Sequence, residues 1–202
     1  MLRVSCLHIG ISRTGTAHMH HHSGNRMLHI GAGRRKLKGA VTLDINPRLN
    51  PDVVWDLNAF PYPFPDNSFD LIVCEHILEH LQDVIRVMEE LHRIAVPGGR
   101  VWIRVPHFSS LNFHTDPTHV HAFSSRSFDY LCEGTELAQY DYSTVRFRKL
   151  AARMTMRPLT PLNRLLMRLI NRYLLFYEEH LAYIIPGQEL LFVLEVVKHR
   201  DS

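Results

Sequence analysis

The sequence contains few cysteines, and none of them are spaced as a structural framework. Cys6, Cys74 and Cys132 are the three cysteines in 202 residues, and no C-x-x-C pair occurs. A small disulfide scaffold and a cysteine zinc site are therefore excluded, and we expect a reduced, cytoplasmic setting. No apolar run approaches the roughly 20 residues that a membrane span requires, so no transmembrane segment is predicted.

The sequence also lacks the marks of a nucleic-acid or nucleoside triphosphate protein. The net charge is +3, and no run of lysine and arginine interleaved with aromatic residues is present, which disfavours a nucleic-acid substrate. The phosphate-binding pattern G-x-x-x-x-G-K-[ST] is missing as well. We predict one domain over residues 27–199, preceded by residues 1–26 as a disordered leader or upstream extension, with Met27 as a candidate start.

The stretch from Met27 to Asp44 carries the first chemical signal. A short apolar run ends in Gly31-Ala32-Gly33, and a second apolar run ends in Asp44. Glycines at the end of a buried strand let the backbone approach a ligand, and an acid at the next strand end can accept hydrogen bonds from ribose. A dinucleotide fingerprint would need a third glycine and a full helix, whereas only residues 34–40 separate the glycine turn from Val41. The pattern predicts a nucleoside site and a vestigial first crossover helix.

Further strands and helices are predicted along the chain from hydrophobic periodicity and from turn residues. Asp83 is expected to cap a helix that runs to Ala95, with Pro97-Gly98-Gly99 as its stop. An amphipathic helix is expected over residues 162–177, begun by Thr160-Pro161; it faces the core, and peripheral membrane contact is the alternative. Strands are predicted at residues 52–57, 69–74, 100–105, 144–156 and 190–197. This alternation favours a parallel sheet.

The motifs LHIGAG, TLDIN, VVWDL, PFPDNSFDLIVCEHILEHL and VPGGRVWIRVP follow one another in the sequence. In this order they resemble the class I S-adenosylmethionine-dependent methyltransferases of the type 11 family. The resemblance implies an α/β, Rossmann-like sheet of seven strands, mostly parallel with an antiparallel last strand. It also implies S-adenosyl-L-methionine as cofactor and methyl transfer as activity, and we expect a small molecule or a sugar as acceptor.

The resemblance further implies which residues bind the cofactor. Gly31 and Gly33 would face its methionine and ribose, Asp44 the ribose hydroxyls, and Ile45 the adenine. For Asp56, turn capping is an equal alternative to a cofactor contact. Two positions depart from the family pattern: His29 stands where an acid is usual, and Arg34 where a further glycine is common. The full predicted set is Gly31, Ala32, Gly33, Asp44, Ile45, Asp56, Leu57 and Glu75.

Several histidines are candidates for chemistry at the acceptor. If the acceptor is a hydroxyl, a base is required, and the candidates are His76, His114, His119 and His121. The loop from His114 to His121 could instead bind a divalent metal or be plain polar surface, and no metal is assigned. Two other functions stay open: a non-catalytic cofactor-binding module of the same fold, and a zinc hydrolase that uses His76, Glu79 and His80. The sequence does not identify the acceptor or the oligomeric state.

Overall fold

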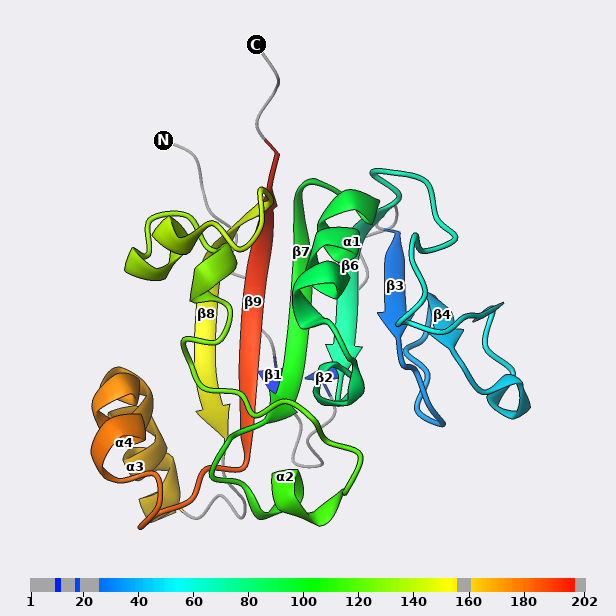
Figure 1. Ribbon diagram of the computed structural model, residues 1–202. Helices are drawn as coiled ribbons and strands as arrows, with labels where there is room; N and C mark the ends of the chain where they lie inside the picture. Colours follow the sequence, from blue (N-terminus) through cyan, green and yellow to red (C-terminus); the bar gives the residue numbers. More distant parts are fainter. Residues whose placement is uncertain (1–9, 12–16, 19–25, 156–160, 199–202) are drawn as a thin grey trace.

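The computed structural model describes residues 10–11, 17–18, 26–155 and 161–198. Its main sheet has seven strands: β3 (Met27–Ile30), β4 (Ala40–Asp44), β5 (Val53–Val54), β6 (Phe69–Glu75), β7 (Ala95–Pro106), β8 (Arg146–Thr155) and β9 (Glu189–Val197). Their order across the sheet is β5-β4-β3-β6-β7-β9-β8 (Figure 1). The short strands β1 (Gly10–Ile11) and β2 (Ala17–His18) pair antiparallel with each other.

The direction of the strands confirms the predicted sheet. β3 pairs parallel with β4 and β6, and β6 pairs parallel with β7. β9 is antiparallel to both of its neighbours, β7 and β8. The chain runs outward from β3 in both directions, so the carboxyl ends of β3, β4 and β6 meet where the strand order reverses. Open α/β sheets bind their ligands at this place.

Helices are few around this sheet. The structure forms α1 (Val84–Ile94), α2 (Leu111–Thr115), α3 (Pro161–Arg172) and α4 (Leu174–His180), together with 3-10 turns that include η2 (Leu78–His80). No helix forms in residues 31–39, all of which are described, so the vestigial first crossover is confirmed. No helix of the described residues has the length and apolar character to cross a membrane.

Two predicted helix ends differ from the structure. The Asp83 side chain accepts a hydrogen bond of 2.9 Å from the backbone N–H of Arg86, which confirms the cap of α1. Ala95 was expected in this helix, but it begins β7, which continues through the glycines that were predicted as a stop. The second amphipathic helix is divided at Tyr173 into α3 and α4. Thr160, predicted as its cap, lies outside the described residues.

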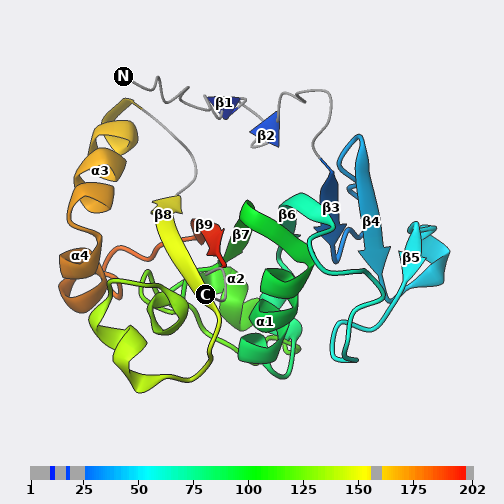
Figure 2. The ribbon, with the colours of Figure 1, turned by 90° about the horizontal axis from the view of Figure 1, so that it is seen from above.

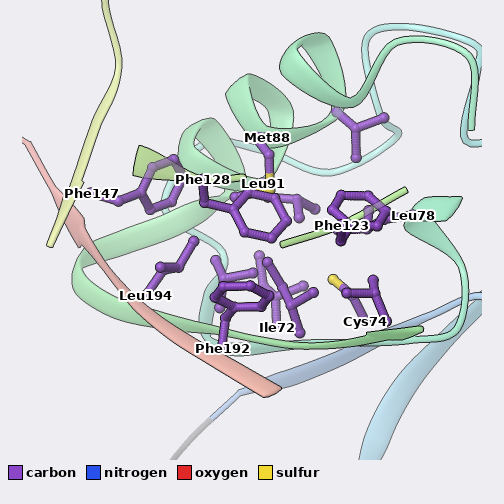
Figure 3. Packing of buried hydrophobic residues seen from close by; sticks show 14 of the residues in the cluster. Ile72, Cys74, Leu78, Met88, Leu91, Phe123, Phe128, Phe147, Phe192 and Leu194 are labelled. Carbon is purple, nitrogen blue, oxygen red and sulfur yellow. The ribbon is translucent and has the colours of Figure 1, made fainter. Parts of the chain in front are cut away.

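The core lies between α1 and one face of the sheet. Figure 2 shows α1 and α2 on this side and β1 and β2 on the other, with α3 and α4 beyond the edge strand β8. Alternate residues of the strands point toward α1, so Ile72 and Cys74 of β6 are completely buried against it. Phe128 packs edge-on against Phe192 with ring centroids 4.9 Å apart (Figure 3). Both rings belong to the same buried cluster as Ile72 and Cys74.

Candidate active site

The glycine turn after β3 requires glycine at its first position. Gly31 has a φ of +59°, and a Cβ added there would lie 2.5 Å from the side chain of Ile77. Gly33 also has a positive φ, +53°. A side chain at Gly31 would be both strained and blocked by Ile77, so glycine is required there, and Gly31 also lines the pocket at these strand ends.

Asp44, at the end of β4, is held in place by this turn. Its Oδ2 accepts a hydrogen bond of 2.9 Å from the backbone N–H of Gly33, and its Oδ1 accepts one of 2.9 Å from that of Asn46. A carboxylate has about four acceptor positions, so each oxygen keeps capacity for a further donor. The side chain is therefore oriented in advance for hydroxyl groups that enter beside the glycine turn.

An open pocket of about 190 Å³ lies at these strand ends. Its volume is below the roughly 300–1,000 Å³ of pockets that enclose a whole drug-sized ligand, so it fits part of a nucleoside ligand. The residues that line it are Gly31, Asp44, Ile45, Trp55, Asp56, Leu57, Asn58, Ile77, His80 and Leu81.

The pocket unites five of the eight residues predicted to bind the cofactor, namely Gly31, Asp44, Ile45, Asp56 and Leu57. Ala32 and Gly33 belong to the glycine turn without lining the pocket. Sequence reasoning missed Trp55, Asn58, Ile77 and Leu81, and it considered His80 only as a zinc ligand. Each of these residues follows a strand end closely, and this position was the available signal.

Asp56 caps a turn and lines the pocket at the same time. Its Oδ1 accepts hydrogen bonds from the backbone N–H of Asn58 at 2.9 Å and from the Asn58 side chain at 3.2 Å. The strand predicted here is shorter than expected, because β5 stops at Val54 and the chain turns at Asp56. The two roles that the sequence left open are thus compatible in one residue.

Glu75 lies outside the pocket lining. Its carboxylate is 4.0 Å from Nε2 of His29 and 3.7 Å from Nη1 of Arg104, on the sheet face opposite α1. Burial lowers the pKa of His29, and the charge of Glu75 opposes this shift. Glu75 and His29 therefore form a polar pair on the other face of the sheet.

His76 is held between two carboxylates. Its Nδ1 lies 3.4 Å from Oε1 of Glu79, and its Nε2 lies 3.2 Å from Oε1 of Glu189. The neighbouring carboxylates of Glu189 and Glu79 raise the pKa of His76 to about 9, so the ring is protonated at neutral pH and is a poor base. The backbone of His76 is left-handed with a φ of +50°, and residues 78–80 form a 3-10 turn. The helix that a zinc hydrolase would need for His76 and His80 is therefore absent from this described segment.

The loop after α2 reaches the same carboxylate. His119 Nε2 lies 3.9 Å from Oε1 of Glu79, and the backbone N–H of Val120 donates to the Glu79 carbonyl at 2.8 Å. His121 Nε2 contacts the Gln82 carbonyl oxygen at 3.2 Å, whereas His114 is exposed and packs edge-on against Phe113. Of the four histidines predicted as bases, His76 and His119 gather around Glu79, and the other two do not.

Comparison with known proteins finds similarity to methyltransferases. Residues 28–103 match the family described as "Methyltransferase domain". The uncharacterized methyltransferase YcgJ of Bacillus subtilis is 31% identical over 90 residues, which cover 39% of this chain and 35% of that protein. A demethylmenaquinone methyltransferase of Anoxybacillus flavithermus is 43% identical over 44 residues, which cover 22% of this chain and 19% of that protein. The chain thus matches about a third or less of the length of these relatives.

Two solved structures share the fold. A SAM-dependent methyltransferase from Archaeoglobus fulgidus superposes with a TM-score of 0.51 at 21% identity, over 86% of each chain. The YcgJ crystal structure superposes with a TM-score of 0.54 at 15% identity, over 87% of this chain and 93% of that one.

The seven-stranded sheet with β9 inserted antiparallel is the fold of a class I methyltransferase. Residues 28–103 also match the family model of the type 11 methyltransferases, so this part of the chain is similar to that family. The cofactor that this family and fold imply is S-adenosyl-L-methionine. The bare backbone of Gly31 and the fixed carboxylate of Asp44 suit the ribose of such a cofactor.

Proposed function

We propose that this domain, predicted over residues 27–199, transfers a methyl group from S-adenosylmethionine to a small-molecule or sugar acceptor. The observation that carries the proposal is the carboxylate of Asp44, held by the glycine turn at the mouth of a strand-end pocket. In this proposal Gly31, Gly33 and Asp44 bind the methionine and ribose part. Ile45, Asp56 and Leu57 bind the adenine.

The cofactor supplies an activated sulfonium methyl group, so the protein's task is alignment of the acceptor more than elaborate catalysis. The polar loop from His114 to His121 lies beside η2, and this favours an acceptor that carries hydroxyl groups. Small-molecule acceptors also occur among the relatives, as the name demethylmenaquinone methyltransferase indicates. Because His76 is protonated at neutral pH, we assign it to binding and orientation instead of proton removal.

Isothermal calorimetry with S-adenosylmethionine tests the binding part of the proposal. We expect Asp44→Ala to weaken binding by tenfold or more, on the order of 1.4 kcal/mol. Asp70→Ala is the matched control, because Asp70 pairs with Arg26 at the opposite end of the strands and should leave binding unchanged. Equal affinities of the parent and Asp44→Ala would refute the assigned site.

Methyl transfer itself is tested with a labelled methyl donor and a panel of hydroxylated small molecules and sugars. Methyl transfer by the parent that is lost in Asp44→Ala supports the proposed methyltransferase activity. Donor binding without transfer to any member of a broad panel would instead favour the non-catalytic module of the same fold.

A further inference from the structure

Glu79 is a buried carboxylate with no hydrogen-bond partner for either oxygen. The residue is completely buried, and both Oε1 and Oε2 lack a partner among the described residues. A buried carboxylate whose oxygens accept no hydrogen bond is costly, so such a position asks for a physical reason. The nearest imidazole nitrogens, of His76 and His119, lie at 3.4 and 3.9 Å, which are ion-pair distances. Both carboxylate oxygens of Glu79 therefore remain open to a ligand or cation that approaches more closely than these rings.

Three side chains converge here with the chemistry of a metal site. One ligand atom each from Glu79, His80 and His119 lies within 4.8 Å of the other two. A carboxylate with two imidazoles is a common zinc set that leaves a fourth position open. Ligand atoms on zinc are about 3.3–3.5 Å apart when the bonds are about 2.0–2.1 Å, so these side chains would close by at most about 1.5 Å on an ion.

The two histidines are oriented by partners outside the cluster. Nδ1 of His119 lies 3.0 Å from the Phe113 carbonyl oxygen, to which it donates. Nδ1 of His80 lies 2.8 Å from Oγ1 of Thr118, and that hydroxyl donates at 2.7 Å to Asp116. Because the Thr118 hydroxyl donates its hydrogen to Asp116, its oxygen can only accept a hydrogen bond from Nδ1–H of His80. In the neutral tautomer that these contacts favour, Nε2 of each ring carries the lone pair, and such outer partners are typical of metal-binding histidines.

We propose that Glu79, His80 and His119 bind a divalent cation of the zinc type. This set differs from the hydrolase pattern, because both nitrogens of His76 face carboxylates and the third ligand comes from the distant loop. His80 also lines the strand-end pocket, so the cation would lie beside it. The open fourth position suits water or an oxygen of the acceptor, and this last assignment rests on the proposed methyl transfer.

The test uses zinc alone as probe and the full chain. The run from His18 to His22 can bind zinc by itself, so its histidines are replaced by alanine in every protein compared. After equilibration with zinc and gel filtration, elemental analysis should give one zinc per chain. Competition with a chromophoric chelator should then show at least a tenfold loss of zinc affinity in His119→Ala and in His80→Ala.

Matched variants separate ligation from general damage. His114→Ala removes an exposed histidine of the same loop outside the cluster, and it should retain zinc. Thr118→Val removes only the hydroxyl that orients His80, and we expect it to lower the zinc affinity by about 10- to 100-fold. Unchanged zinc affinity in His119→Ala, or less than half an equivalent of zinc in the parent, would overturn the site.

Far-UV circular dichroism and calorimetry with S-adenosylmethionine are recorded on the same proteins. Loss of zinc in His119→Ala with an unchanged spectrum and unchanged cofactor binding supports the site, because His119 does not line the cofactor pocket. If cofactor binding is absent in the parent while zinc depends on His119, the methyl-transfer proposal fails and the metal site stands. If His119→Ala loses the circular dichroism spectrum of the folded protein, the zinc affinity of His80→Ala decides the test, because the His80 side chain is only partly buried.

Discussion

Oδ2 of Asp44 accepts a hydrogen bond of 2.9 Å from the backbone N–H of Gly33, across the tips of two neighbouring strands. The bond joins the two parts of the predicted nucleoside site, the glycine turn and the acid, into one unit. A change in the turn should therefore disturb the acid, and this coupling can be measured.

Gly31→Ala should weaken S-adenosylmethionine binding by at least tenfold and lower the free energy of unfolding by about 1–3 kcal/mol. The added Cβ would be strained at positive φ and would meet Ile77 at 2.5 Å. Gly134→Ala is the matched control, because its φ is +76° but nothing lies within 4 Å of the added Cβ. Gly134→Ala should lower the free energy of unfolding through the same strain at positive φ, but calorimetry should give the parent affinity for S-adenosylmethionine. Parent-like binding by Gly31→Ala would contradict the close approach inferred here.

Leu91→Ala should lower the free energy of unfolding by about 2–5 kcal/mol, because it opens a cavity between α1 and the sheet. Leu91 is completely buried (Figure 3). Leu111→Ala makes the same chemical change at a side chain that is 78% exposed, and it should stay within about 0.5 kcal/mol of the parent. Urea denaturation measures both, and equal midpoints would argue against the described core.

Asp83→Ala should lower the free energy of unfolding by about 0.5–2 kcal/mol, since the variant leaves the backbone N–H of Arg86 without its acceptor at the start of α1. Asp83→Ser keeps an acceptor oxygen at this position and should recover most of the loss. Thermal unfolding of the three proteins checks the prediction. A serine variant as unstable as the alanine variant would mean that the cap is not the cause.

The stability of the fold should fall on the acid side because of His29. Burial lowers the pKa of this histidine below its ordinary value of about 6.5, so as the pH falls the unfolded chain binds the proton first. The stability from neutral His29 is fully present above about pH 6.5 and is lost as the pH falls through the folded pKa. Urea titrations between about pH 7 and 5 should show a shallower decline for His29→Gln than for the parent. Parallel declines would assign the acid sensitivity to other groups.

Much of the fold followed from local patterns. The buried run of β6, the cap at Asp83 and the short link after Gly33 each have a near-neighbour cause, and the structure confirms them. The predictions of helix ends were wrong where residues distant in the sequence but close in space determine the secondary structure. Ala95 fits a helical face, but it extends β7 because Phe69 of β6 pairs with it. The break at Tyr173 gave no clear signal, since the apolar face continues through it.

The sequence by itself determined that a glycine turn and an acid end adjacent strands, because two-residue and 3.6-residue periodicities and glycine chemistry are local properties. It could not determine that His119 meets Glu79, some forty positions earlier. That contact depends on the loop after α2 folding back so that the Val120 N–H binds the Glu79 carbonyl. Only the tertiary structure selects among the many histidines, because proximity in space is set by how the sheet brings its strand ends together and not by spacing along the chain.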